Sequence, residues 1–501
     1  MTAKGVWIKI INMNTYIGID LGTSSVKLEW VRADGKIIVT KTKDYPICYP
    51  KSGWSEQNPL DWFSAIKDGL KELLQGRNRE SVKGISFGGQ MHGLVILDKD
   101  DNVIRPAILW NDGRTQKQTD YLNEVVGKKK LSDYTANIAF AGFTAPKILW
   151  VKENEPDNFA RIDKIMLPKD YIAYRLCGAF CTDYSDASGM LLLDVKQRRW
   201  SREMLEICGI KESQLPSLYE SYASVGKLNM VLADELGLPK DVIIATGAGD
   251  NAAAAVGNGA VTNSACNISL GTSGTVFIAS DSFGVDENNA LHSFCHASGT
   301  YHLMGCILSA ASCSKWWTED VLQSRHKKEQ EDMQQYLGKN EVFFLPYLMG
   351  ERSPHNDVTA RGTFIGMRPN TTRKQMTLSV LEGVAFALKD CVSIAASNGM
   401  EISSARICGG GATSPLWKQI IADVLNIKLE VLDFERGPAY GAAILAMVAA
   451  NEYKSVEDAT NKLIKVKETV APQKRNVENY KEKYDVFKKL YPALKDVFGL
   501  M

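Results

Sequence analysis

The sequence predicts an α/β protein built from two duplicated lobes. The chain has 501 residues, which is too many for one hydrophobic core. Its content of 45% hydrophobic and 23% charged residues is that of an ordered α/β protein. A strand–turn–strand pattern near residue 16 returns about 250 residues later, and repeats spaced so widely indicate duplicated domains rather than a solenoid.

Bulk properties exclude several classes of function. The net charge is +1, so no field of one sign attracts the chain to nucleic acid or to an anionic membrane. No run approaches the roughly 18 consecutive apolar residues of a membrane span. The ten cysteines are scattered, as in a reduced compartment. Residues 1–13 have no small-residue cleavage site, so we interpret them as a short extension and expect a cytoplasmic protein.

The first copy of the hairpin is YIGIDLGTSSVKLEW, beginning at Tyr16. Its turn contains Gly22, Thr23 and Ser24, whose backbone N–H groups and hydroxyls suit a phosphate group. Asp20 ends the apolar strand, where a carboxylate is costly to bury without a partner. A Mg²⁺ ion bridging phosphate oxygens is one such partner. Capping of the turn is the alternative role for Asp20.

The second copy is CNISLGTSGTVFIAS, beginning at Cys266, with Gly271 and Thr272 in its turn. Ser269 stands where the first copy has Asp20, so one lobe carries the acid and the other does not. A tight hairpin turn would also use Gly and Ser. The repetition of the turn favours two phosphate-holding turns, one in each lobe.

The stretch VIIATGAGDNAAAAVG, residues 242–257, allows two interpretations. Its Gly247-x-Gly249-x-x-Ala252 spacing matches a dinucleotide fingerprint, which requires an acidic residue about 20 positions later. The corresponding region, VTNSACNISLGTSGT, contains no Asp or Glu. We therefore expect Asp250 to be a general base that accepts a proton from an attacking alcohol. A helix N-cap is the structural alternative for Asp250.

A third glycine cluster lies in ARICGGGATSPLWKQIIADVLN, residues 405–426. The pattern is a strand, three glycines and an amphipathic helix, and a helix N-terminus reached through glycines suits an anion or nucleotide. We expect Gly410, Gly411 and Ala412 to contact the nucleotide.

Histidines and cysteines gather in LHSFCHASGTYHLMGC, residues 291–306, and these side chains bind zinc in other proteins. The stretch alternates about a Ser-Gly-Thr turn, which predicts a β-hairpin with neighbouring side chains on opposite faces. We favour the hairpin over a zinc site.

Taken together, these motifs resemble the FGGY family of carbohydrate kinases and, within it, the xylulokinases. The similarity runs from about Tyr16 to the C-terminal helix. The segments GQMHG and LWNDGRT carry the most specific part of the resemblance. The motifs are IGIDLGTSSVK, GWSEQNP (53–59), GQMHG (89–93), LWNDGRT (109–115), GAGDNAA, SLGTSGT, GERSPHND (350–357) and CGGGATSPLW.

The resemblance implies two lobes of the actin-like ATPase (ribonuclease H-like) fold with a cleft between them. It places a sugar-binding N-terminal lobe in residues 14–258, and an ATP-binding C-terminal lobe with C-terminal helices in 259–501. It assigns Asp250 as proton acceptor, Asp20 as the residue near Mg²⁺ and the β/γ-phosphates, and Met91 and His92 as sugar contacts. We expect Asn251 to contact the sugar as well. The expected ATP contacts are Gly22, Thr23, Ser24, Gly271, Thr272, Gly410, Gly411 and Ala412.

The reaction implied is transfer of the ATP γ-phosphoryl group to D-xylulose, giving D-xylulose 5-phosphate, by a monomer or a homodimer. Kinases for ribulose, fuculose or glycerol are the nearer alternatives. An actin-like ATPase that transfers nothing to a sugar is the more distant one. One departure from the family pattern is Tyr440 in AYGAA, which we expect to lie near the adenine pocket.

Overall fold

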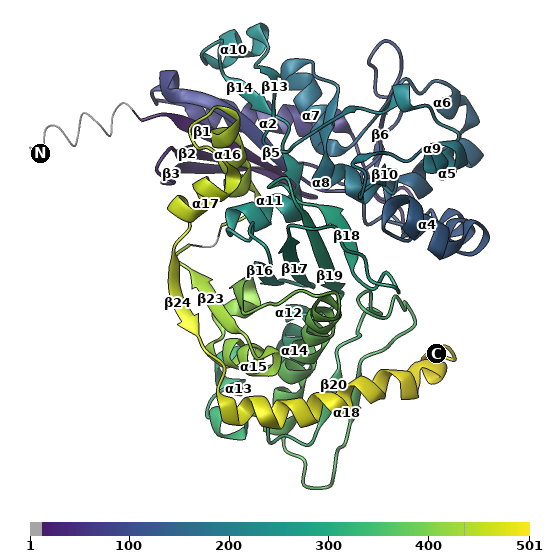
Figure 1. The fold of residues 1–501 in the computed structure, drawn as a ribbon, viewed down its shortest axis with the longest axis vertical. Coiled ribbons are helices and arrows are strands. Elements are labelled where there is room, and N and C mark those ends of the chain that lie inside the picture. The colour runs from purple at the N-terminus through teal and green to yellow at the C-terminus, as the bar shows by residue number, and fades with distance from the viewer. Residues whose placement is uncertain (1–12, 435) are drawn as a thin grey trace, which may run out of the picture. The chain divides into compact units, whose positions relative to one another are not determined.

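The computed structural model describes residues 13–434 and 436–501, which form two compact units (Figure 1). Unit 1 comprises residues up to Val261, Ser293–Tyr301 and Arg436–Ile464. Unit 2 comprises Thr262–His292, His302–Glu435 and Lys465–Met501. The extension predicted at the N-terminus lies, apart from Met13, outside the described residues. These two units are discontinuous in sequence. The predicted lobes 14–258 and 259–501 were drawn from the internal repeat, and this division into lobes stays a prediction.

The main sheet of unit 1 is mixed. Its strands follow the order β13-β14-β5-β1-β2-β3, with β15 also paired to β5. β1 runs antiparallel to β2 and parallel to β5. The predicted first hairpin is therefore confirmed. The strands of this unit are β1 (Thr15–Leu21), β2 (Ser25–Arg32), β3 (Ile37–Asp44), β4 (Glu56–Gln57), β5 (Val82–Gly89), β6 (Val95–Leu97), β7 (Ala107–Ile108), β8 (Lys164–Met166), β9 (Cys181–Asp183), β10 (Leu193–Asp194), β11 (Arg199–Trp200), β12 (Ser217–Tyr219), β13 (Ser224–Lys227), β14 (Ile243–Ala245) and β15 (Ala248–Gly249).

Helices of unit 1 begin at recognisable caps. The Asn58 side chain accepts a hydrogen bond from Leu60 N at the start of α2, with Pro59 at the first helical position. The helices are α2 (Pro59–Leu74), α3 (Gln116–Asp120), α4 (Lys128–Thr135), α5 (Thr144–Asn154), α6 (Pro156–Ala160), α7 (Pro168–Cys177), α8 (Tyr184–Ala187), α9 (Arg202–Cys208), α10 (Met230–Leu236), α11 (Asp250–Gly257), α16 (Pro438–Ala449), α17 (Val456–Leu463), the 3₁₀ turns η1 (Arg79–Ser81), η3 (Ser188–Met190) and η4 (Glu212–Gln214), and the π-helix η2 (Tyr121–Gly127).

The small-residue helix α16 belongs to unit 1, although it lies far along the chain. Figure 1 shows it beside β1. A Cβ atom on Gly18 of β1 would lie 1.8 Å from the Ala439 carbonyl oxygen, and one on Gly441 would lie 1.8 Å from that of Ala253 in α11. Glycine is therefore required at both positions for the backbones to approach so closely. The small residues of α16 thus have a structural role in this packing.

The sheet of unit 2 repeats the hairpin. Its main strands follow the order β19-β17-β16-β22-β23-β24, with β16 antiparallel to β17 and parallel to β22. The predicted second hairpin is confirmed, and the Cys/His stretch forms strands β18 and β19. The strands are β16 (Cys266–Leu270), β17 (Gly274–Ser280), β18 (His292–Cys295, whose last three residues belong to unit 1), β19 (Tyr301–Ile307), β20 (Phe343–Leu345), β21 (Thr363–Ile365), β22 (Ser404–Cys408), β23 (Lys428–Leu432) and β24 (Val466–Val470).

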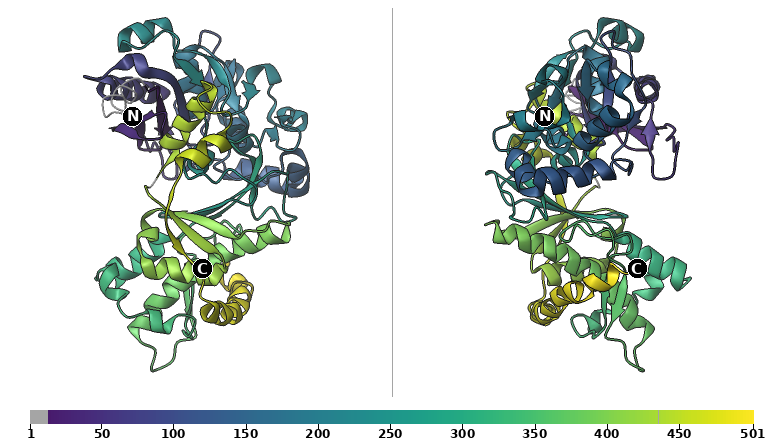
Figure 2. Two further views of the ribbon diagram at one scale, coloured as in Figure 1. Left: turned by 60° about the vertical axis from the view of Figure 1, so that its left-hand side comes forward. Right: turned by 90° about the vertical axis from the view of Figure 1, so that its right-hand side faces the viewer.

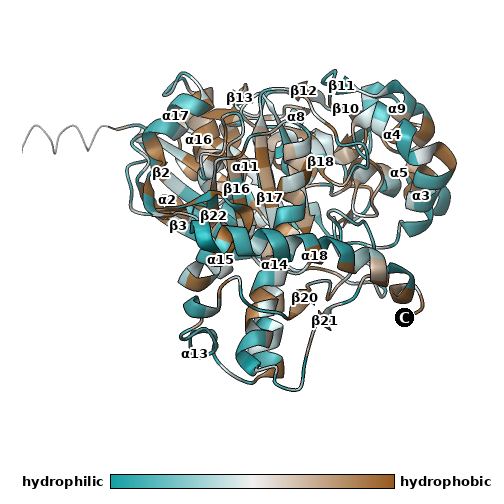
Figure 3. Ribbon diagram, turned by 60° about the horizontal axis from the view of Figure 1, so that its bottom comes forward, coloured by the Kyte–Doolittle hydropathy of each residue, from teal (hydrophilic) through white to brown (hydrophobic). Residues whose placement is uncertain are grey.

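Helices cover the second sheet, and β16 and β17 appear brown, hydrophobic, in Figure 3. The helix predicted after the glycine cluster is α15, where Ser414 is the N-cap and Leu416, Ile420 and Ile421 are buried. The yellow C-terminal helix α18 packs against α15 (Figure 2). It stays helical through Pro492, although proline removes a backbone donor from a helix interior. The helices are α12 (Ala311–Lys315), α13 (His326–Glu329), α14 (Arg373–Ser397), α15 (Pro415–Leu425), α18 (Lys474–Phe498), the π-helix η5 (Trp316–Val321), and the 3₁₀ turns η6 (Gln334–Tyr336) and η7 (Gly410–Thr413).

Candidate active site

Asp250 is the first residue of α11, and Gly249 occupies the N-cap position. The N-cap alternative is therefore wrong, because the chain turns into the helix one residue earlier. Oδ1 of Asp250 accepts hydrogen bonds from the backbone N (2.7 Å) and the side-chain Nδ2 (3.0 Å) of Asn251. Within the described residues, Oδ2 of Asp250 has no such partner. One oxygen is thus held in place while the other remains able to accept a proton.

Burial raises the pKa of Asp250 to about 6, although the hydrogen bonds from Asn251 oppose the shift. A carboxylate with such a pKa is ionised at neutral pH and is a stronger base than an exposed aspartate. Asp250 therefore has the properties that the sequence prediction requires of a general base.

Asp20 lies at the end of β1, opposite Lys27 on β2 and beside Gly88 on β5. Burial raises the pKa of Asp20 to about 7, and the nearby charge of Asp250 adds to the effect, whereas Lys27 opposes it. Lys27 is itself paired with Glu29 at 2.6 Å. Two partly buried carboxylates thus lie close together with little positive charge beside them, which is an environment that a cation would stabilise.

Side chains from two other motifs hold the first glycine turn. The Tyr45 hydroxyl donates to the Gly22 carbonyl oxygen at 2.5 Å. Gln57 Nε2 donates to the Thr23 carbonyl oxygen at 2.6 Å, and Trp110 Nε1 donates to Thr23 Oγ1 at 2.9 Å. Gln57 belongs to GWSEQNP and Trp110 to LWNDGRT, so the structure explains why these segments accompany the turn. Ser24, the third predicted contact in this turn, is exposed.

The same glutamine connects the turn to the predicted sugar contacts. Gln57 Oε1 accepts a hydrogen bond from Gln90 Nε2 at 3.0 Å, and Gln90 directly precedes Met91 and His92. Met91 is 5% exposed and lies against Gly249, where a Cβ atom would be 3.0 Å from Met91 Sδ. Met91 is therefore next to the N-cap residue of α11, which directly precedes Asp250.

His92 has a left-handed backbone, with φ of 69°. Its Nδ1 lies 2.7 Å from the Gly189 carbonyl oxygen, which can only accept, so Nδ1 carries the proton in the neutral ring. Nε2 is then the acceptor atom. The ring also stacks on Phe143, with the centroids 4.6 Å apart. The imidazole is held in one orientation with an acceptor that suits a hydroxyl group.

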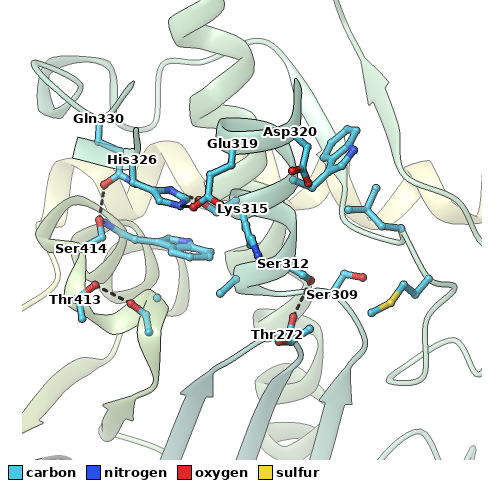
Figure 4. Close-up of a pocket in the computed structure, with 18 residues that line it drawn as sticks. Thr272, Ser309, Ser312, Lys315, Glu319, Asp320, His326, Gln330, Thr413 and Ser414 are labelled. Carbon is cyan, nitrogen blue, oxygen red and sulfur yellow. Dashed lines mark hydrogen bonds and ion pairs between the residues drawn. The ribbon is translucent and has the colours of Figure 1, made fainter. Parts of the chain in front are cut away.

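Unit 2 contains a cavity of about 730 Å³ (Figure 4). Of the predicted nucleotide contacts in this unit, Thr272, Gly410 and Gly411 line it, whereas Gly271 and Ala412 do not. The other lining residues are Ser309, Ala311, Ser312, Ser314, Lys315, Trp316, Glu319, Asp320, His326, Gln330, Leu348, Met349, Thr413, Ser414 and Trp417.

The second glycine turn is held by the segment that follows β19. The backbone N of Ala310 donates to the Thr272 carbonyl oxygen, and that of Ala311 donates to the Gly271 carbonyl oxygen, both at 2.9 Å. Ser312 Oγ also donates to the Thr272 carbonyl oxygen, at 2.7 Å. Gly271 thus supports the cavity wall through its backbone.

Polar pairs cross the wall of the cavity. Ser414 Oγ donates to Gln330 Oε1 at 2.6 Å, and His326 Nε2 lies 3.3 Å from Glu319 Oε1 (Figure 4). Sequence reasoning missed Glu319, His326 and Gln330, because residues 316–330 carry no glycine motif or periodic pattern that marks a site.

Tyr440 does not line this cavity. It is fully buried in unit 1, and its hydroxyl donates to the Gly35 carbonyl oxygen at 3.0 Å. Tyr440 is a core residue where α16 packs on the sheet of unit 1, and its expected effect on an adenine pocket stays a prediction.

Two duplicated α/β units, one with a carboxylate pair and the other with a glycine-lined cavity, define a phosphotransferase of the actin-like ATPase type. The family model described as "FGGY family of carbohydrate kinases, N-terminal domain" matches residues 15–257, and its C-terminal counterpart matches residues 266–450. The chain belongs to the FGGY family of carbohydrate kinases, and ATP is its co-substrate.

Similar proteins carry a narrower name. The chain is 40% identical over 482 residues to a xylulose kinase of Escherichia coli K12, covering 96% of this chain and 99% of the relative. It is 37% identical over 496 residues to a xylulose kinase of Bacillus subtilis 168, covering 97% and 98%. A crystal structure of a xyloylose kinase from Brucella ovis has a TM-score of 0.92 at 39% identity, covering 97% of this chain and 100% of that one. This likeness confirms the predicted fold class of two actin-like ATPase lobes.

None of the helices in the described residues has the length and apolar character needed to span a membrane.

Proposed function

We propose that this protein transfers the γ-phosphoryl group of ATP to the 5-hydroxyl of D-xylulose. The observation that carries the proposal is the state of Asp250 at the start of α11. Asn251 holds one oxygen of this carboxylate, and the other oxygen has no hydrogen-bond donor in the described residues. Met91 lies against Gly249, the residue before Asp250, and is followed by His92 from GQMHG. Among the ketopentoses, we choose D-xylulose as the substrate because the relatives carry the name xylulose kinase.

The chemistry required of the base is a single proton transfer. The sugar hydroxyl gives its proton to Asp250 Oδ2 as its oxygen forms a bond to the γ-phosphorus. The bond from phosphorus to the bridging oxygen of ADP breaks in the same displacement, so the charge leaves with ADP. The Nε2 acceptor of His92 binds a sugar hydroxyl, and Met91 packs on the carbon skeleton. Asn251 orients the base and remains a predicted sugar contact.

A Mg²⁺ ion fits the residues around Asp20. This carboxylate and Asp250 lie close together and partly buried, and each raises the need for a nearby positive charge. Asp20 would hold the ion, with the turn residues Gly22, Thr23 and Ser24 presenting donors to phosphate oxygens. When bound, the ion neutralises charge on the phosphate oxygens.

The cavity of unit 2 would bind the nucleotide. Its volume of about 730 Å³ falls in the range of small-molecule sites, and its glycines allow close approach of phosphate oxygens to the backbone. Thr272, Gly410 and Gly411 are the lining contacts that we propose. Gly271 and Ala412 would act through the backbone that shapes the wall.

The distant alternative, an ATPase that transfers nothing to a sugar, makes a different prediction from the same site. ADP release should depend on a sugar if the proposal is right. We expect ADP release from the wild-type protein with Mg²⁺ and ATP to rise on addition of D-xylulose, and to rise less with ribulose, fuculose or glycerol. Equal ADP release with and without every sugar and polyol would favour the ATPase. Cytoplasmic location and the choice between monomer and homodimer stay predictions.

A further inference from the structure

A chain of buried polar groups leads from α7 to the start of α11. Lys169 is fully buried, and its Nζ lies 2.7 Å from Asp170 Oδ1 and 2.9 Å from Asp183 Oδ1. Asp183, at the end of β9, is also fully buried. A buried charge is stable only when it is paired and hydrogen-bonded, so Lys169 keeps the Asp183 carboxylate in place.

Asp183 in turn fixes a serine hydroxyl. Asp183 Oδ2 accepts hydrogen bonds from Ser185 N at 2.9 Å, from Ser185 Oγ at 2.5 Å and from Ser221 Oγ at 2.6 Å. Because the Ser185 hydroxyl donates its hydrogen bond to the Asp183 carboxylate, its oxygen is left as an acceptor with a defined direction.

That acceptor meets the backbone of the catalytic segment. Gly249 N donates to Ser185 Oγ at 3.2 Å. Gly249 is the N-cap residue of α11, so it immediately precedes Asp250. It also pairs with Gly89 of β5 and packs against Met91. A shift of this one peptide would therefore move the base and alter its distance from Met91.

We infer that Ser185, held by Asp183 and Lys169, is a positioning residue that fixes Asp250 relative to the sugar hydroxyl. The inference rests on the proposed function, since it needs Asp250 to be the base. Ser185 contacts no substrate in this scheme. It acts through the Gly249 peptide, and displacement of a reacting group by about 1 Å costs on the order of 10²-fold in rate.

A neighbouring serine provides a matched control. Ser188 lies one helical turn after Ser185 and is also fully buried. Its Oγ donates to the Tyr184 carbonyl oxygen at 2.7 Å and accepts from Cys295 N at 3.0 Å. These hydrogen bonds do not involve α11. Ser188→Ala therefore removes an equally buried hydroxyl without touching the path to Asp250.

The test compares Ser185→Ala, Ser185→Thr and Ser188→Ala by steady-state kinetics with ATP, Mg²⁺ and D-xylulose, together with thermal unfolding. We expect Ser185→Ala to lower kcat by about 10–100-fold, with KM for ATP within about twofold of wild type. Ser185→Thr keeps the hydroxyl and should recover most of kcat. Ser188→Ala should keep the wild-type kcat even if its unfolding temperature falls as far as that of Ser185→Ala.

Equal kcat values for Ser185→Ala and Ser188→Ala would overturn the inference. If Ser185→Ala does not fold, Ser185→Cys takes its place, because a thiol is a poor acceptor of similar size, and the same loss of kcat is expected. Asp250→Asn, measured in the same assay, separates the two proposals. A fully active Asp250→Asn protein contradicts the proposed base. An inactive one, beside a Ser185→Ala protein of wild-type kcat, contradicts only the positioning role.

Discussion

The hairpins β1–β2 and β16–β17 share a fold but differ in what they carry and in what holds them. In each, the first strand runs antiparallel to the second and parallel to a strand that leads into glycines. Asp20 and Ser269 occupy equivalent places, one residue before the end of their strands. The first turn is held by side chains, through Gln57 and Trp110. The second is held mainly by backbone donors of residues 310 and 311.

The difference between the hairpins shows how two copies of one backbone acquire different roles. A glycine turn with inward N–H groups suits phosphate in either copy. In the proposed scheme one residue, Asp20 against Ser269, decides which copy can carry a cation. The supporting segments decide the rest: residues 308–330 build a cavity around the second turn, whereas GWSEQNP and LWNDGRT tie the first turn to the predicted sugar contacts. The following predictions test this division, starting with the largest expected effect.

Asp250→Asn should lower kcat by about 10²–10⁴-fold, the usual contribution of a positioned base. The amide keeps the size of the side chain and can still accept the hydrogen bonds from Asn251, but it cannot take a proton. Burial raises the pKa of Asp250 to about 6, so its charge is unfavourable in the fold at neutral pH, and the variant should unfold at the same temperature or higher. Rapid-quench and unfolding measurements check both parts. Wild-type turnover by this variant would contradict the assignment of the general base to unit 1.

Asp20→Asn should lower kcat by about 10²–10³-fold, as loss of a group that stabilises developing charge does. Burial first, and then the charge of Asp250, raise the pKa of Asp20 to about 7. The folded state therefore binds this proton more tightly than the unfolded state. Stability from this group is greatest at acid pH and is lost as the pH rises from about 4 to about 7.

The variant lacks that loss, so without Mg²⁺ it should unfold at a higher temperature than wild type at pH 8 but not at pH 4. The matched control is Ser269→Ala in the second hairpin, which should change neither kcat nor this pH dependence. Equal losses of kcat in the two variants would contradict the division between the copies.

Gly410→Leu should raise KM for ATP by about 10–100-fold, if filling the cavity costs about the 1–3 kcal/mol of an overpacked site. A Cβ atom on Gly410 would have no neighbour within 4 Å, so the fold should tolerate the change. KM for D-xylulose should not change, and it provides the internal control. A selective loss of sugar affinity would contradict the proposal that unit 2 binds ATP and unit 1 binds the sugar.

His92→Asn should weaken use of the sugar by about 1–3 kcal/mol, the cost of hydrogen bonds left unmade. Asparagine tolerates the left-handed backbone of this residue, so the loss reports on the imidazole rather than on strain. Calorimetry with D-xylulose and with ATP separates the two affinities. An effect confined to ATP binding would show that His92 does not belong to the sugar site.

The smallest effect concerns pH. A base must be deprotonated to act, so kcat/KM for the sugar should fall to half near pH 6, the pKa to which burial raises Asp250. Below that pH, kcat/KM should decrease about tenfold per pH unit. A profile that is flat from pH 5 to pH 8 would show that no such base acts.

Prediction from sequence succeeded where the signal was local. The apolar strands, the glycines of each turn and the helix after Gly411 were all readable, and the structure has them. It did not place Tyr440, because a small-residue helix can pack on either sheet and the sequence does not say which. It also left open whether Asp250 caps α11 or begins it, since Asp and Gly both serve as N-caps, and the structure puts Gly249 at the cap.

By itself, the sequence determined the two hairpins, the acid at Asp20, the carboxylate at Asp250 and the glycine-led helix α15. These depend on turn chemistry and on periods of two or 3.6 residues, which act over a few neighbouring positions. Only the tertiary structure decided that α16 joins unit 1, that Ser185 meets Gly249, and that residues within 319–330 line one cavity with Thr272 and Gly410. Those contacts join residues distant in the chain, and they form only when packing of whole helices and sheets brings the side chains together.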